Sequence, residues 1–229
     1  MTRLFRTLAV ATALLAAHAA MAQAHYDPNI AIGAKAGATL SRTNFQPSVP
    51  QNMVPGFTAG VTFRYMEETH FGIIAELNVE QRGWKEKFKD MPYRFSRRFT
   101  YLQLPVLSHI YFGRNKVRGF FNAGPAIGVM IGESTSSNFD HHNAASIPEI
   151  TANYRPTAQY TLPVKYKFDY GIAAGLGMEF VAGKKHSFLL EGRFYYGLND
   201  VFAHRKKDTF AGSGGMSVIM TLGYFYRLK

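Results

Sequence analysis

The stretch KYKFDYGIAAGLGMEFV, Lys165–Val181, alternates between two kinds of residue at every step. A period of two is the pattern of a β-strand, and here it runs well beyond the about five or six residues of a typical strand. The odd positions carry mostly charges and glycines. The even positions are all apolar: Tyr166, Phe168, Tyr170, Ile172, Ala174, Leu176, Met178 and Phe180. Such a strand is typical of a barrel wall between lipid and a narrow polar interior.

Seven further stretches of the chain show the same period. Together with the first they predict an all-β fold, an eight-stranded antiparallel up-and-down transmembrane β-barrel. A soluble lipocalin-like barrel would also have eight strands, but its large residues would face inward. The further predicted strands are Ile30–Leu40, Gly56–Tyr65, Phe71–Gln81, Thr100–Phe112, Val117–Gly132, His186–Leu198 and Gly215–Leu228.

The connections between the predicted strands alternate in length. Tight turns are expected at 67–69, 113–116 and 182–185, and much longer connections at 41–55, 82–99, 133–164 and 199–214. Outer-membrane barrels have short periplasmic turns and long outer loops. The alternation therefore predicts that both mature termini lie on the periplasmic side.

The first 24 residues have the features of an export signal. Arg3 and Arg6 are followed by the apolar segment Leu8–Ala20, and small residues then allow cleavage after Ala22 or Ala24. A retained anchor helix is the alternative, but this apolar segment is short for a membrane span. Residues 25–229 are accordingly expected to form one barrel domain in the bacterial outer membrane.

Composition narrows the partners of the mature chain. Cysteine is absent, so an exported protein of this length is held together without disulfides. The formal net charge is +11, which falls to +9 when Arg3 and Arg6 leave with the signal. Nucleic acid is a poor partner for an exported protein. The basic surface instead favours anionic lipid head groups, an anionic polymer or a protein partner of unknown identity.

Extending the period through all eight strands places ten charged residues on the inward face. Charges in a narrow lumen are tolerated when they are paired, and this set is half basic and half acidic. Because eight strands leave room only for side chains, we expect a plug rather than a pore. The predicted interior ion network comprises Lys35, Arg64, Glu76, Glu80, Arg118, Lys167, Asp169, Glu179, Glu191 and Arg193.

Small residues should make room for these charges. Counting from the turns places Gly171, Ala173, Gly175 and Gly177 roughly opposite Tyr195, Arg193 and Glu191, and places Gly60 and Gly56 near Glu76 and Glu80.

Two prolines fall inside predicted strands. Pro105 is expected beside Gly124 or Pro125, and neither proline has an N–H to donate to the ladder. We expect a bulge or ladder break there, with Gln103 and Asn122 supplying replacement hydrogen bonds.

The residue patterns of enzymes are weak in this chain. Ser108 and His109 are adjacent on a predicted strand, so they face opposite ways and cannot form a nucleophile–base pair. His141 and His142 with Asp140 could bind a metal, but they lie in the longest predicted loop. We therefore expect no enzymatic activity, no catalytic residues, no cofactor and no metal site.

Five motifs resemble the PorT-like outer-membrane β-barrel domain family. They are GAKAGATLS (33–41), YLQLPVLSHIYF (101–112), FFNAGPAIGVMI (120–131), FDYGIAAGLGMEF (168–180) and YYGLNDV (195–201). The resemblance implies an eight-stranded outer-membrane barrel of the OmpA/OmpX general kind, mostly without an assigned activity. It also implies one alternative, an accessory component of a protein-secretion apparatus.

Together these observations predict a small, monomeric, closed outer-membrane barrel. Its expected role is structural or adhesive, or binding through the outer loops. A narrow channel for small solutes is a further alternative.

The predicted loop 82–99 contains the strongest cluster of positive charge. It carries seven basic residues against Glu86 and Asp90. Continuing the outward register of the flanking strands places four of them on the lipid side, just above the membrane. Phosphates of outer-leaflet lipopolysaccharide lie at that height, and basic side chains match phosphate. A solvated loop is the alternative to the predicted anionic-lipid site Lys85, Lys87, Arg94 and Arg98.

Overall fold

The computed structural model describes residues 29–66, 70–113, 116–151, 157–203 and 208–228. The predicted signal segment and both cleavage sites lie outside these residues. Among the helices in the described ranges, none is long and apolar enough to cross a membrane.

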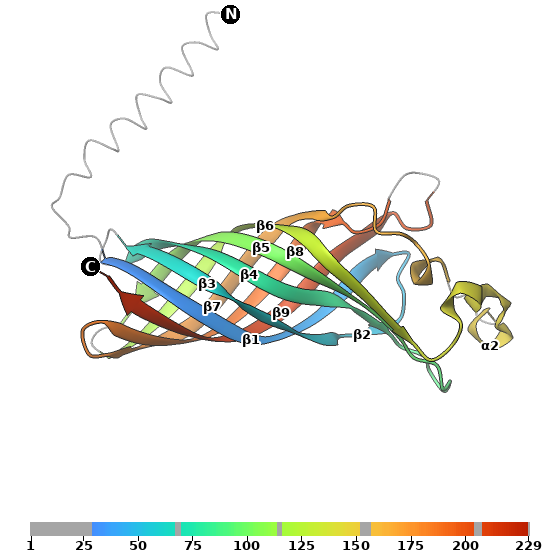
Figure 1. The fold of residues 1–229 in the computed structure, drawn as a ribbon, viewed down its shortest axis with the longest axis horizontal. Helices are drawn as coiled ribbons and strands as arrows, with labels where there is room; N and C mark the ends of the chain where they lie inside the picture. The colour runs from blue at the N-terminus through green and yellow to red at the C-terminus, as the bar shows by residue number, and fades with distance from the viewer. Residues whose placement is uncertain (1–28, 67–69, 114–115, 152–156, 204–207, 229) are drawn as a thin grey trace, which may run out of the picture.

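Eight long antiparallel strands form a closed ring (Figure 1). Each long strand pairs with the long strands before and after it in the chain, and the pairing of β1 with β9 closes the ring. The short strand β2 (Gln51–Asn52) adds to the end of β4. The predicted eight-stranded up-and-down architecture is confirmed. The long strands are β1 (Asn29–Gln46), β3 (Val54–Met66), β4 (Phe71–Glu86), β5 (Phe95–Phe112), β6 (Val117–Ser137), β7 (Phe168–Ala182), β8 (His186–Asp200) and β9 (Gly212–Arg227).

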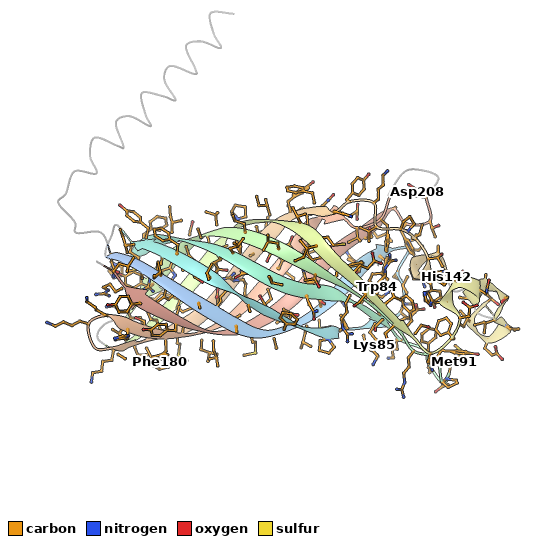
Figure 2. All side chains as sticks on the ribbon, viewed as in Figure 1. Trp84, Lys85, Met91, His142, Phe180 and Asp208 are labelled. Carbon is orange, nitrogen blue, oxygen red and sulfur yellow. The ribbon has the colours of Figure 1, made fainter. Side chains whose placement is uncertain are left out.

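The two faces of the wall differ as the period of two requires. Outward side chains are large and apolar, and several are more than half exposed, such as Leu176 on β7 and Leu222 on β9 at 69%. Inward side chains are buried, and many of them are polar or charged. Figure 2 shows apolar side chains projecting from the wall along the length of the barrel. The molecule is therefore built around a polar interior and an apolar outer surface.

Four strands run at least five residues beyond their predicted ends, and the first is β1, which continues to Gln46. β4 continues to Glu86, β5 begins at Phe95, and β6 continues to Ser137, so most of the predicted loop 82–99 and the start of 133–164 are strand. The reason is that inward residues keep their alternation after outward residues have become polar. These extensions, with η1 (His141–Ser146), α2 (Pro148–Thr151) and η2 (Ala158–Tyr160), lie at the end opposite the C-terminus (Figure 1).

The prolines interrupt the ladder as predicted. Pro105 lies opposite Ala126, one residue from the expected partner. Within the described parts of β5 and β6, bridging pairs are missing at residues 106–107 and 124–125, and pairing resumes in the same register at Ser108 and Ala123. The β4–β5 ladder is also interrupted beside Pro105, at residues 76–77 of β4. Each break adjoins a residue that lacks a backbone donor.

Two details of the proline prediction are wrong. The register shift in this hairpin lies between Thr100 and Tyr101, several residues away from Pro105. The side chain of Asn122 bonds to other interior side chains, and Gln103 Nε2 is buried without a hydrogen-bond partner among the described residues. The expected replacement bonds are therefore not formed.

Candidate functional site

The middle of the barrel is crossed by a cluster of paired charges. Arg193 on β8 donates two hydrogen bonds to the two carboxylate oxygens of Glu76 on β4, at 2.7 and 2.8 Å. Lys35 on β1 donates to the same carboxylate at 2.5 Å. Glu191 accepts from Arg193 at 2.9 Å and from Asn122 at 2.9 Å. Four strands thus meet across the lumen through buried side chains.

A second cluster lies nearer the loop end and centres on Arg82. This residue, which the sequence analysis placed in a loop, is buried on the inward face of β4. Arg82 donates to Asp169 at 2.8 Å, and its ion pair with Glu80 measures 3.3 Å. Its guanidinium lies 4.1 Å from the ring centroid of Tyr101 and 4.3 Å from that of Tyr195. Tyr195 also donates to Asp169, so the group spans β4, β5, β7 and β8.

A third cluster lies near the end that carries the termini. Arg64 on β3 donates to Glu179 on β7 at 2.9 Å, and both side chains are 1% exposed. The guanidinium also lies over the ring of Phe225 on β9. Apolar residues complete this layer, among them Tyr111 and Phe120. The lumen is therefore filled at this end as well.

Glycines and alanine on β7 face the large interior side chains of β8. The register places Ala173 opposite Tyr195, Gly175 opposite Arg193 and Gly177 opposite Glu191. This matches the expected juxtaposition. On β3 the predicted partners, Gly60 for Glu76 and Gly56 for Glu80, are each two residues away from the observed ones. Glu76 lies opposite Thr62 and Glu80 opposite Thr58.

Two predicted members of the interior network lie outside the clusters. Lys167 is exposed and precedes β7, so its side chain is not part of the lumen. Arg118 is half-buried over the ring of Tyr111, beside its register partner Glu179. Arg82, which the predicted network did not include, is a basic member of the interior. The signal that would have found it is the inward alternation Arg82, Trp84, Glu86, which continues the pattern of β4.

The loop end of the barrel is closed by aromatic side chains. Trp84, Phe202 and Phe45 are buried there and contact one another, with ring centroids 5.1 to 6.2 Å apart. Tyr160 from η2 and Ile150 from α2 cover them from the long connection after β6. We call this group the aromatic plug: Phe45, Val49, Trp84, Phe95, Phe99, Tyr101, Met130, Ala144, Ile150, Tyr160, Val201, Phe202 and Phe210.

Arg97 ties the aromatic plug to the long connection. Predicted to lie in a loop, it is buried on β5 and pairs with Glu133 on β6. Its guanidinium also donates to the backbone oxygen of Leu162 at 2.7 Å and lies over the ring of Phe202. The connection from β6 to β7 is thus fixed against the barrel mouth.

The histidine pair in this connection is not organised as a metal site. Asp140 accepts from the backbone N–H of His142 and from Asn143, and these hydrogen bonds, the one from the Asn143 side chain foremost, hold the pKa of Asp140 below its ordinary value. No group of three or more metal-ligating side chains occurs in the part of the chain that the structure describes.

A basic groove lies on the outer wall beside the plug. Lys85 on β4 and Arg94 and Arg98 beside or on β5 line a cavity of about 230 Å³. Ser96 and Ser136 add hydroxyl groups to it. The backbone of Arg94 is held by Asn138, which accepts its N–H at 2.6 Å. Figure 2 shows Lys85 in the half of the barrel away from the termini.

The fourth predicted residue of this group is placed differently. Lys87 is exposed and its backbone N–H bonds to the oxygen of Pro50, but it does not line the cavity. Among the residues that the structure describes, none forms an ion pair with Lys85, Arg94 or Arg98. These three cations are therefore available to an anion from outside the protein.

Comparison with known proteins agrees with a barrel that has an apolar belt and a charged core. The model of the outer membrane protein beta-barrel domain matches residues 21–203. The chain belongs to this family. Its place is therefore the bacterial outer membrane, with the apolar outer surface of the barrel against lipid. No curated protein sequence matches the chain.

Solved structures of the same fold are distant in sequence. The outer membrane protein OprG from Pseudomonas aeruginosa aligns with a TM-score of 0.52 and 13% identity, covering 89% of this chain and 97% of that protein. Neisserial surface protein A aligns with a TM-score of 0.44 and 11% identity, covering 87% and 97%. At 13% identity the likeness to OprG shows the fold alone.

Proposed function

We propose that this protein is a closed, non-conducting and non-enzymatic barrel whose role is structural or adhesive, or binding through its outer end. The observation that carries the proposal is the filled interior, in which three charged clusters and the aromatic plug follow one another along the lumen. The proposal includes a monomeric state, a cleaved signal, both mature termini in the periplasm and membership of the PorT-like group within the broader family.

The positions of Ser108 and His109 in the barrel wall also support a non-enzymatic role. Ser108 is exposed on the outer face of β5, whereas His109 is buried and bonds to Asn122 at 2.6 Å. The two side chains lie on opposite faces, so the one nucleophile–base pair suggested by adjacency cannot act together.

Planar-bilayer recording tests the closed barrel. Purified protein should insert without stable single-channel steps, because paired side chains occupy the lumen of a barrel this narrow. Insertion is verified by recovering folded protein from the same bilayer preparation. Reproducible ohmic steps that scale with salt concentration would favour a solute channel instead. Co-purification with a secretion complex from native membranes would favour the accessory role.

The basic groove gives the binding role a ligand, the phosphate groups of lipopolysaccharide. The groove lies on the outward face of β4 and β5, where the polar pair Gln81 and Thr100 separates it from the apolar pair Val79 and Leu102. That is the boundary between lipid tails and head groups. Two arginines can each present paired donors to phosphate, and Lys85 adds a point charge.

A matched pair of variants tests this ligand. The triple change Lys85→Gln, Arg94→Gln and Arg98→Gln should lower the lipopolysaccharide that co-purifies with the barrel and weaken the dependence of its retention on salt. The control is Lys87→Gln with Lys89→Gln, which removes exposed charge from the same loop without touching the groove. Equal retention by wild type and the triple variant would show that the groove does not bind lipopolysaccharide.

A further inference from the structure

A second groove, separate from the basic groove, lies on the outer wall in the half of the barrel nearer the termini. It measures about 620 Å³, within the size range of ligand pockets, and is almost wholly apolar. Ala34 on β1 and Ala75 on β4 contribute small side chains to it, and Phe63, Leu77 and Tyr224 are larger lining residues. The groove therefore forms in the convex wall because short side chains lie among long ones.

One border of this groove carries polar and charged groups in fixed contacts. Tyr224 and Tyr226 on β9 line the groove. The hydroxyl of Tyr224 lies 2.7 Å from Nδ1 of His186, and the ammonium of Lys185 lies 5.7 Å from the ring centroid of Tyr226. His186 is also the register partner of Tyr226. The apolar groove thus continues into a rim of tyrosine, histidine and lysine.

The chemistry of the rim suits a phosphate group. Lys185 and His186 are both exposed, and Lys185 provides a full positive charge. When Nδ1 of His186 accepts a hydrogen bond from the hydroxyl of Tyr224, Nε2 of the neutral ring carries the hydrogen and can donate it. Tyrosine side chains favour the boundary between apolar tails and polar head groups. The rim and the groove together match one molecule with an apolar tail and an anionic head.

We propose that this groove is a binding site for an anionic phospholipid, with an acyl chain in the Ala34–Ala75 groove and the phosphate at Lys185 and His186. The inference rests on the proposed function in one respect, because it places the terminus end of the barrel in the periplasmic leaflet. It differs from an ordinary aromatic girdle, which would contact many lipids in turn without retaining one or selecting its head group.

Native mass spectrometry of the full barrel, released from nanodiscs made of equal parts phosphatidylethanolamine and phosphatidylglycerol, tests the site. Wild type should retain phosphatidylglycerol in preference to phosphatidylethanolamine. Filling the groove with Ala34→Phe and Ala75→Phe should abolish retention, whereas Lys185→Gln should remove the head-group preference. Controls are Ala174→Phe, an outward alanine on β7, and Lys116→Gln, an exposed lysine in another turn, both of which should behave as wild type.

Each result decides the matter once folding is verified by the heat-dependent gel shift of the barrel. Retention by the filled variant equal to wild type would overturn the acyl site. Equal retention of both lipids by wild type, or an unchanged preference in Lys185→Gln, would overturn the phosphate site. If a double-phenylalanine variant fails to fold, Ala34→Leu alone is measured against Ala174→Leu. The test uses none of the basic-groove residues, so its failure is distinct from failure of lipopolysaccharide binding.

Discussion

At the scale of single residues, Glu76 and Glu191 share the buried cations of the interior unequally. It accepts from Lys35, Arg193 and Asn78, whereas Glu191 accepts from Arg193 and Asn122 and lies 4.0 Å from Lys35. Removing one partner of a buried pair is costly because the remaining charge is left without compensation. The two glutamates should therefore differ, since loss of Glu191 leaves Arg193 paired with Glu76.

Urea unfolding of the barrel in lipid vesicles should separate these two residues. Glu76→Ala is expected to lower the free energy of unfolding by about 3–5 kcal/mol, because it leaves two buried cations underpaired. Glu191→Ala should cost about 1.5–3 kcal/mol, the value of hydrogen bonds to a charged group. The exposed Glu149→Ala is the control and should change little. A larger loss for Glu191→Ala than for Glu76→Ala would contradict the geometry.

A double-mutant cycle tests whether Glu191 and Arg193 act together. The pair shares hydrogen bonds at 2.9 Å inside the lumen. The double change Glu191→Ala with Arg193→Ala should lower the free energy of unfolding by less than the sum of the single changes. The reason is that the second deletion removes a charge that had already lost one of its partners in the first. Additive free energies of unfolding would show that the two residues are independent.

Single residues also show what the sequence could predict. Nine of the charges assigned to the lumen, all but Lys167, lie on strands that the period of two located, because a closed wall fixes which face each residue occupies. Arg82 and Arg97 were missed because outward polarity was taken as the end of the strand. Past the apolar outer surface, only the inward residues still alternate with the period of two. The partners across the lumen could not be predicted, because they depend on side-chain reach.

At the scale of strands, the small inward residues of β7 leave room for interior side chains of the two neighbouring strands, β6 and β8. A Cβ atom added at Gly177 would lie 2.4 Å from the ring of Phe120 and 2.3 Å from the backbone oxygen of Leu190. Neither neighbour has room to retreat, since Phe120 is buried and Leu190 belongs to the ladder. Gly192, on the outer face of β8, has no atom within 4 Å of such a Cβ.

These two glycines make a matched test of interior packing. Gly177→Ala should lower the free energy of unfolding by about 1–3 kcal/mol through overpacking. Gly192→Ala, on the neighbouring strand, should change it by less than about 0.5 kcal/mol. The measurement is again urea unfolding in vesicles, with folding confirmed by gel shift. Equal effects would show that β7 does not pack against the interior as described.

At the scale of the whole molecule, closure has two separable parts. The charged clusters block the lumen within the strands, and the aromatic plug covers the loop end with help from η2 and α2. The sequence indicated the first part through its balanced inward charges. It did not indicate the second, because the aromatic residues of the plug come from strand extensions and a long connection that show no common period.

Trp84, the only tryptophan of the chain, reports on the plug directly. It is fully buried on the inward face of β4, so its fluorescence should resist quenching by aqueous acrylamide and by nitroxide groups attached to lipid tails. Opening the cover with Ile150→Ala and Tyr160→Ala should raise acrylamide quenching, since both side chains pack on the plug. The same variant should still show no conductance, because Arg82–Asp169 and Arg193–Glu76 remain paired below it. Strong quenching of the wild type by lipid nitroxides would place Trp84 on the outer face, and channel steps in the variant would make the plug the main barrier instead of the charged clusters.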